Sequence, residues 1–171
     1  MTFLLRPWQI SDAENLVIHA NNPKIAQFLT NGFPHPYTIE HAHSFIQMVS
    51  QHQPTQIFAI VVEEETVGSI GLHLQSDIMC KNIELGYFIG EDFWGKGIMT
   101  EAIRKIVDYG FENFEVVRIF ARPFGNNFAS QRVLEKAGFT LEARIEGNIY
   151  KNGAFQDELI YAIRKTPLQN P

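Results

Sequence analysis

A glycine-rich stretch in the middle of the chain has the composition of an anion-binding loop. The segment DFWGKGIMTEA, residues 92–102, places Gly95 and Gly97 on either side of Lys96, and an apolar pattern of helical period begins at Ile98. Glycine lets the backbone approach a ligand closely, and the first N–H groups of a helix are unpaired and lie at the positive end of its dipole. We therefore expect the main chain from Gly95 to Thr100 to bind an anion.

Two common nucleotide-binding motifs fit this stretch poorly. The segment GEDFWGKG, residues 90–97, follows the P-loop pattern GxxxxGK[ST] until its last position, where Gly97 replaces the hydroxyl residue that binds magnesium. Glu91 and Asp92 would also add negative charge to a phosphate site. The dinucleotide pattern GxGxxG would need a glycine at Thr100. The sequence therefore argues against a nucleotide triphosphatase and against a dinucleotide-binding enzyme.

Composition excludes several other classes of protein. The chain has 171 residues, of which 45% are apolar and 19% charged, as expected for one globular domain. A net charge of -5 argues against general nucleic-acid binding, which relies on clustered Lys and Arg. Cys80 is the only cysteine, so no intrachain disulfide can form, which suits a reducing compartment. No apolar run is long enough for a membrane span or a signal peptide, and we expect a soluble, cytoplasmic protein.

The histidines and the cysteine do not have the spacing of a metal site. The six histidines are scattered along the chain, and neither an HExxH nor a CxxC motif is present. His41 and His43 are two residues apart, so on a helix their side chains would diverge. We expect no metal.

Apolar periodicity and turn residues predict the elements that position this loop. The helix over 13–20 is expected to begin with a capping box from Ser11 to Glu14, and a hairpin turn is expected at Glu65-Thr66. Gly138 is expected to end the last helix. Strands are predicted over 3–6, 57–64, 67–75, 82–90, 116–122, 139–150 and 154–164, and helices over 13–20, 23–28, 39–49, 98–114 and 128–137. Because a helix separates them, strands 82–90 and 116–122 are expected to pair in parallel, in one α/β or α+β domain around a mixed sheet.

Four segments in this order resemble the GNAT superfamily, the acetyl-coenzyme A-dependent N-acetyltransferases. Within it, the chain is most similar to the branch of ribosomal-protein N-terminal (alanine/serine) acetyltransferases. The resemblance implies one N-acetyltransferase domain over 1–171, with a central mixed, mostly antiparallel sheet of about seven strands flanked by helices. The segments that carry it are LRPWQISDAENL (4–16), IELGYFIGEDFWGKGIMTEAI (83–103), NNFASQRVLEKAGF (126–139) and KNGAFQDELIYAI (151–163).

The resemblance also implies how acetyl-coenzyme A is bound. The backbone of Phe88 and Ile89 would pair with the pantetheine amides as a further strand would, and Asn127 would bind the pantetheine arm. Two positions of the loop depart from the family pattern, since Trp94 stands where Gln or Arg is usual and Met99 where Gly or Ala is usual. The side chain of Met99 must therefore point away from the phosphates. The residues implied to hold the pyrophosphate through their N–H groups are Gly95, Lys96, Gly97, Ile98, Met99 and Thr100.

Two residues are candidates for the proton transfers of such an enzyme. Glu84 shares one face of its strand with Gly86, whose missing side chain would leave room for a substrate, and Glu84 could act as a general base through water. Ser130 could protonate the leaving sulfur, because Leu134 stands where many superfamily members have a Tyr. The alternatives are a structural Glu84 and a helix start at which Asn127 and Ser130 only cap the backbone.

The sequence leaves two functional hypotheses open. The first is an acetyltransferase in which a primary amine attacks the thioester directly, through a tetrahedral intermediate. The second is a non-catalytic domain of the same fold that binds an acyl-coenzyme A or a peptide. Protein N-termini, spermidine-like amines, amino sugars and antibiotics all remain open as acceptors, and the protein could be a monomer or a homodimer.

Overall fold

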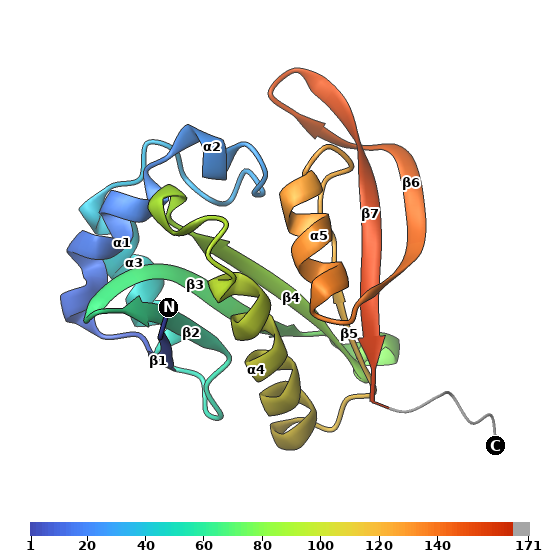
Figure 1. The fold of residues 1–171 in the computed structure, drawn as a ribbon, viewed down its shortest axis with the longest axis horizontal. Coiled ribbons are helices and arrows are strands. Elements are labelled where there is room, and N and C mark those ends of the chain that lie inside the picture. Colours follow the sequence, from blue (N-terminus) through green and yellow to red (C-terminus); the bar gives the residue numbers. More distant parts are fainter. Residues whose placement is uncertain (166–171) are drawn as a thin grey trace. The chain divides into compact units, whose positions relative to one another are not determined.

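The computed structural model describes residues 1–165. Seven strands form one mixed sheet in the order β1-β2-β3-β4-β5-β7-β6 (Figure 1). The strands are β1 (Leu4–Pro7), β2 (Ile57–Val62), β3 (Glu65–Leu74), β4 (Asn82–Ile89), β5 (Arg118–Ala121), β6 (Thr140–Lys151) and β7 (Ala154–Arg164). The α-helices are α1 (Ala13–Ala20), α2 (Pro23–Ala26), α3 (Ile39–Val49), α4 (Ile98–Asn113) and α5 (Phe128–Lys136), and the 3-10 helices are η1 (Ile10–Asp12), η2 (Asp77–Met79) and η3 (Glu91–Phe93).

The chain divides into two compact units, and β3, β4 and α4 each begin in one unit and end in the other. The first unit holds Met1–Gly71 and Tyr87–Ala102, and the second holds Leu72–Gly86 and the described residues from Ile103 to Lys165. Strand β4 pairs in parallel with β5, while β1–β2, β2–β3, β5–β7 and β6–β7 are antiparallel. The predicted mixed, mostly antiparallel sheet is therefore confirmed.

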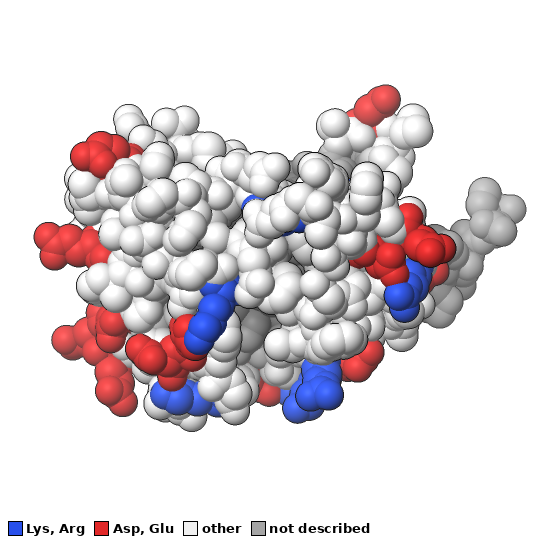
Figure 2. Space-filling view, turned by 90° about the horizontal axis from the view of Figure 1, so that it is seen from above, with Lys and Arg blue, Asp and Glu red and all other residues white. Residues whose placement is uncertain are grey.

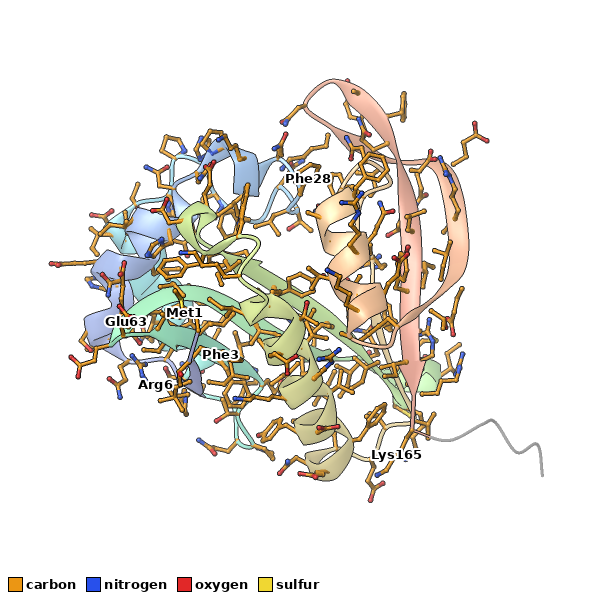
Figure 3. The ribbon with its side chains drawn as sticks, in the orientation of Figure 1. Met1, Phe3, Arg6, Phe28, Glu63 and Lys165 are labelled. Atoms are coloured by element: carbon orange, nitrogen blue, oxygen red, sulfur yellow. The ribbon has the colours of Figure 1, made fainter. Side chains whose placement is uncertain are left out.

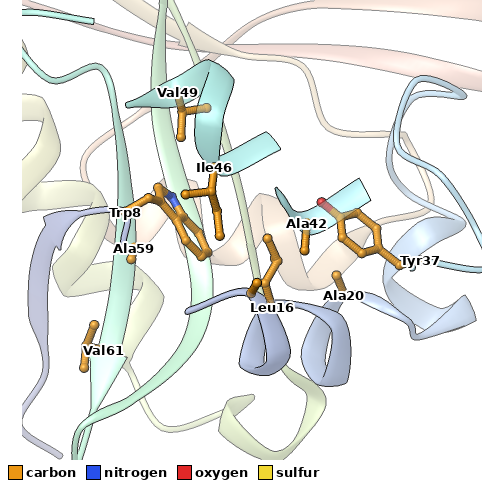
Figure 4. Close-up of a cluster of buried hydrophobic side chains, with 10 residues drawn as sticks. Trp8, Leu16, Ala20, Tyr37, Ala42, Ile46, Val49, Ala59 and Val61 are labelled. Carbon is orange, nitrogen blue, oxygen red and sulfur yellow. The ribbon is translucent and has the colours of Figure 1, made fainter. Parts of the chain in front are cut away.

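In the first unit, helices α1 and α3 bury an apolar core against β1 and β2 (Figure 4). Burying each of its larger side chains contributes about 1.5–3 kcal/mol. Gly68 on β3 is needed for close packing, since a Cβ there would stand 2.4 Å from the carbonyl oxygen of Phe88. The core residues are Trp8, Ala13, Leu16, Ala20, Tyr37, Ala42, Ile46, Val49, Ala59 and Val61.

An ion pair between the partly buried Arg6 and the buried Asp12 joins β1 to the start of the first helix. The guanidinium of Arg6 donates to both carboxylate oxygens of Asp12 at 2.7 Å, and the hydroxyl of Thr66 donates to one of them at 2.7 Å (Arg6 is labelled in Figure 3). The N–H of Gln9 donates to the same carboxylate at 2.8 Å, so Asp12 also caps η1. The predicted capping box from Ser11 to Glu14 is therefore wrong, because the helical segment begins earlier, at Ile10.

The hairpin between β2 and β3 also turns earlier than expected. Its two central residues, Glu63 and Glu64, have φ values of 49° and 71°, as in a type I′ turn (Glu63 is labelled in Figure 3). The turn predicted at Glu65-Thr66 is thus wrong by two residues, and β3 begins at Glu65. Glutamate at positive φ is an unusual choice, which is why the sequence pattern did not reveal it.

The second unit contains β5, the β6–β7 hairpin, α5 and the C-terminal part of α4. Leu72, Ile83, Ile103, Ile106, Ile119 and Leu134 are almost completely buried there. Gly138 follows α5 with a φ of 96°, as predicted for a residue that ends a helix. No helix within residues 1–165 has both the length and the apolar character to cross a bilayer.

Candidate active site

The glycine-rich loop joins η3 to α4 in the first unit. Gly95 and Gly97 have φ values of 72° and 77°, a backbone conformation that side chains with a Cβ rarely adopt. Nothing lies within 4 Å of a Cβ built on either glycine, and both residues are exposed. The loop is therefore open on the side where a ligand would approach.

The N–H groups of this loop are available to a ligand. The hydrogen bond from the Glu101 N–H to the Gly97 oxygen, at 3.3 Å, is the first turn of α4, so the amides of Ile98, Met99 and Thr100 have no intrahelical partner. Within residues 1–165, no amide from Gly95 to Thr100 donates a backbone hydrogen bond. Six consecutive amides without a backbone acceptor therefore lie at the positive end of a 16-residue helix, an arrangement that could bind an anion.

The side chains of the loop leave this site clear. Ile98 and Met99 are buried, so Met99 points into the protein, as its bulk required. The ammonium of Lys96 lies 5.1 Å from the ring centroid of Phe93, at the beginning of the loop. The indole N–H of Trp94 donates to the carbonyl oxygen of Ile89 at 2.8 Å. The aromatic residue that replaces the usual polar one therefore fastens the loop to the end of β4.

Two side chains from α1 and η3 anchor the segment before the loop, and sequence reasoning did not find them. His19 is buried; its Nε2 lies 2.7 Å from the Glu65 carboxylate, and its ring meets that of Phe93 edge-on. Glu91 accepts a hydrogen bond from Lys24 and one from the Asn22 amide at 2.9 Å. The bond from Lys24 is the main reason that the pKa of Glu91 is lowered. These partners are distant in sequence, so no local pattern signals them.

Strand β4 presents the face that the alternation predicted. Ile83 and Leu85 are buried, while Glu84 and Phe88 are half-buried. The parallel ladder with β5 ends at the pair Glu84↔Phe120, and β4 continues to Ile89. In the first unit, Phe88 packs edge-on against Phe33 at 5.5 Å between ring centroids.

The space expected beside Gly86 is partly occupied. A Cβ on Gly86 would stand 3.2 Å from Nε2 of His73, so the imidazole of His73 fills the place of the missing side chain. The expectation that this glycine leaves room for a substrate is therefore wrong at that position. A glycine here lets the ring of His73 lie against the strand.

Both oxygens of Glu84 accept hydrogen bonds from Arg122 in the second unit. The Nε of Arg122 lies 2.9 Å from Oε1 and one terminal nitrogen lies 3.0 Å from Oε2, in a two-pronged arrangement. The other terminal nitrogen donates to the buried Glu158 at 3.3 Å. The hydrogen bond to Glu84 is the main reason that the pKa of Arg122 is raised. Sequence reasoning missed Arg122 and Glu158.

Asn127 and Ser130 meet at the start of α5, also in the second unit. The side-chain oxygen of Asn127 accepts a hydrogen bond from the Ser130 N–H at 3.2 Å, so Asn127 caps this helix. Its amide NH₂ group and the second lone pair of that oxygen are left for a ligand. The predicted residues thus form two groups, each described within its own unit. Phe88, Ile89 and the loop from Gly95 to Thr100 belong to the first unit, and Glu84, Asn127 and Ser130 to the second.

Basic side chains form no patch on the face drawn in Figure 2, and the described residues hold no cluster of metal ligands. On the face drawn in Figure 2, most atoms belong to uncharged residues, and basic side chains are scattered rather than gathered into one patch. Among residues 1–165, no three His, Cys, Asp or Glu side chains come together in a way that could hold a metal ion.

The chain matches the family described as acetyltransferase (GNAT) domain over residues 2–140. The probable N-acetyltransferase YjcK of Bacillus subtilis (strain 168) is 33% identical over 169 residues, which cover 95% of this chain and 93% of that protein. The ribosomal-protein-serine acetyltransferase of Escherichia coli (strain K12) is 27% identical over 115 residues, 67% of this chain and 64% of that protein. Among solved structures, the microcin C7 self-immunity acetyltransferase MccE, in complex with acetyl-CoA and AMP, superposes with a TM-score of 0.81 at 25% identity. That match covers 95% of this chain and 92% of MccE.

Proposed function

This chain belongs to the GNAT family of acetyltransferases, and we propose that it transfers the acetyl group of acetyl-coenzyme A to a primary amine. The observation that carries the proposal is the loop from Gly95 to Thr100. Its two glycines have positive φ, its amides have no backbone partner, and it opens a long helix. These donors fit a diphosphate, and no metal is needed to hold it.

The pantetheine arm of the coenzyme has two sets of proposed partners, each described within its own unit. In our proposal, the backbone of Phe88 and Ile89, beyond the end of the β4–β5 ladder, donates to and accepts from the pantetheine amides. Asn127 keeps its side-chain oxygen on its own helix and offers its NH₂ group to the pantetheine arm. A backbone N–H near the end of β4 would also polarise the acetyl carbonyl as an oxyanion donor.

Glu84 and Ser130 are the proposed proton-transfer residues. An amine must lose its proton before it can attack, and Glu84 would accept that proton through a water molecule. Each carboxylate oxygen has two lone pairs, so the bonds from Arg122 leave one lone pair on each oxygen for that water. Ser130 would donate a proton to the departing thiolate.

A protein N-terminus is the acceptor that we propose to test first. For an α-amine with a pKa of about 7.7–8.0, removing the proton at pH 7 costs about 1 kcal/mol, whereas for a lysine-like amine near 10.4 it costs about 4.6 kcal/mol. Of the two kinds of amine, the α-amine therefore needs the smaller free energy to lose its proton to the base. The name of the similar Escherichia coli enzyme, a ribosomal-protein-serine acetyltransferase, points the same way.

A screen for thiol release over a broad panel of amines tests this function. The panel should hold N-terminal peptides, polyamines, amino sugars and aminoglycosides, and the protein should be compared with its Glu84→Gln variant. We expect thiol release with at least one amine and a loss of roughly 100-fold or more in kcat in Glu84→Gln. Glu142→Gln is the matched control, because Glu142 is also held by an arginine, Arg118.

The same screen separates catalysis from binding alone. A domain that only binds an acyl-coenzyme A would be stabilised against thermal unfolding by coenzyme A but would release no thiol with any amine. Turnover that is unchanged in Glu84→Gln would remove the base assignment while leaving the enzyme class intact.

A further inference from the structure

We propose that Arg122 is a positioning residue for Glu84, which fixes the plane of its carboxylate for proton transfer. This inference rests on the proposed role of Glu84 as the base. The guanidinium approaches with two parallel N–H groups, at 2.9 Å and 3.0 Å from the two oxygens. Only arginine offers such a planar fork, and a single-point donor such as lysine would leave the carboxylate free to rotate.

The register of the sheet explains why these two residues meet. Glu84 on β4 is opposite Phe120 on β5, in the last pair of the parallel ladder. Arg122 follows Phe120 by two residues and comes directly after the end of β5 at Ala121. Side chains two residues apart on an extended chain lie on the same face. Arg122 therefore reaches the carboxylate of Glu84 across the end of the ladder.

A second carboxylate holds the guanidinium from its other side. The remaining terminal nitrogen of Arg122 lies 3.3 Å from Oε1 of Glu158, a residue of β7 that is only 7% exposed. The other oxygen of Glu158 accepts a hydrogen bond from the amide of Asn148, on β6, at 2.6 Å. A charge is costly to bury without partners, and here each oxygen of Glu158 accepts a hydrogen bond, one from Arg122 and one from Asn148. Hydrogen bonds therefore run in series from Asn148 to Glu158, Arg122 and Glu84, and each side chain is oriented by the one before it.

This arrangement has a chemical consequence for the proposed base. The fork occupies one lone pair on each oxygen of Glu84, so the remaining lone pairs have a fixed direction in which a water can be held. Two carboxylates and one guanidinium also leave one net negative charge in the cluster, which favours the approach of an ammonium group.

A purely structural ion pair would have the same geometry, and a double-mutant cycle distinguishes the two roles. A residue that acts through Glu84 should matter only while Glu84 is present, whereas a residue that only stabilises the fold should cost the same with and without it. The variants are Arg122→Lys, Glu84→Gln and their combination. Arg122→Lys keeps the positive charge beside the buried Glu158, so that the fold retains a partner for that carboxylate.

Steady-state kinetics with the best amine give the readout. We expect Arg122→Lys to lower kcat by roughly 10- to 100-fold while the KM for acetyl-coenzyme A stays within about twofold. In the Glu84→Gln background, Arg122→Lys should cause no further loss. Arg118→Lys is the matched control, because Arg118 lies on β5, the strand that Arg122 follows, and donates through Nε and a terminal nitrogen to Glu142. It should leave kcat unchanged.

Two results would overturn the inference. One is an Arg122→Lys variant that turns over like the wild type, and the other is an equal loss of kcat in both backgrounds. A wild type that acetylates no amine would instead contradict the proposed function, so the two failures are distinguishable.

Discussion

The backbone of Gly90 lies directly against the imidazole ring of His19. A Cβ built on Gly90 would stand 2.3 Å from Nδ1 of that ring. The ring cannot move aside easily, because it is buried, lies against Phe93 and has its Nε2 2.7 Å from the Glu65 carboxylate. Since Gly90 is the residue before η3, this contact fixes where the chain enters η3 and the glycine-rich loop that follows.

Replacing Gly90 by alanine should therefore disturb the loop. We expect Gly90→Ala to lower the free energy of unfolding by about 1–3 kcal/mol, as for overpacked sites, and to raise the KM for acetyl-coenzyme A. Gly32→Ala is the control, since a Cβ there meets only Thr30 at an ordinary 3.6 Å. Urea unfolding and steady-state kinetics check the pair, and equal behaviour of the two variants would refute the anchoring role of His19.

The positive φ of Gly97 gives a test of the loop itself. Gly97→Val places a branched side chain at a φ of 77°, where a built Cβ meets nothing within 4 Å, so the fold should survive with a backbone cost of about 1–2 kcal/mol. Coenzyme A should bind roughly 10-fold more weakly or worse, because the amides can no longer converge on one anion. Isothermal titration calorimetry measures this affinity.

Gly153 provides the matched control for that experiment. It has a φ of 78°, also with nothing within 4 Å of a built Cβ, but it lies in the turn between β6 and β7. Gly153→Val should cost similar stability and leave the affinity for coenzyme A unchanged. If both variants weakened binding equally, the loss would come from general strain and not from the loop.

One substitution can separate the two roles of Asn127, which are the observed cap of α5 and the proposed binding of the pantetheine arm. Serine caps a helix about as well as asparagine, so Asn127→Ser should change stability by only a few tenths of a kcal/mol. The serine side chain lacks the amide NH₂ group, so Asn127→Ser should weaken the binding of coenzyme A several-fold. Asn127→Ala should lose the cap as well, at about 1 kcal/mol. Unchanged affinity in Asn127→Ser would reduce Asn127 to a helix cap.

The ion pair between Arg6 and Asp12 predicts a pH-dependent stability. Burial alone would raise the pKa of Asp12, but hydrogen bonds from Arg6, Thr66 and the Gln9 N–H outweigh it, and the pKa is lowered in the folded protein. The unfolded chain has the ordinary value of about 3.9. The contribution of this carboxylate is therefore fully present above that pH and is lost as the pH falls through the lower, folded value.

Urea unfolding of the wild type and of Asp12→Asn at several pH values tests this behaviour. We expect a difference of about 3 kcal/mol at pH 7, which should shrink below about pH 4 as the wild-type carboxylate is protonated. Glu14→Gln, an exposed acidic residue in the first turn of α1, should stay within about 0.5 kcal/mol of the wild type. A difference for Asp12→Asn that is independent of pH would contradict the account of the ion pair.

Periodicity was enough to predict the principal elements of the fold. The stripe that begins at Ile98 gave α4, and the alternation around Glu84 gave the faces of β4, because both reflect burial along one local element. The two errors at element boundaries, at Ser11–Glu14 and at Glu65-Thr66, have a common cause. In each place a contact or a backbone conformation that the local pattern does not encode decides the boundary, namely the ion pair of Asp12 with Arg6 and the positive φ of Glu63 and Glu64.

The candidate site was only partly accessible from the sequence. The conformational freedom of glycine is local, so the loop with positive φ at Gly95 and Gly97, directly before a helix, could be predicted from the sequence. The partners that hold the candidate residues are far away in the chain: Arg122 is separated from Glu84 by 38 residues, and Glu158 from Arg122 by 36. Their roles depend on sheet register, which one sequence does not reveal.

A crystal structure of the protein with acetyl-coenzyme A is the most direct test of the central claim. The account predicts diphosphate oxygens at about 2.7–3.2 Å from main-chain nitrogens between Gly95 and Thr100, with no metal ion between them. A diphosphate bound elsewhere, or held by side chains while these amides turn to partners within the protein, would contradict it.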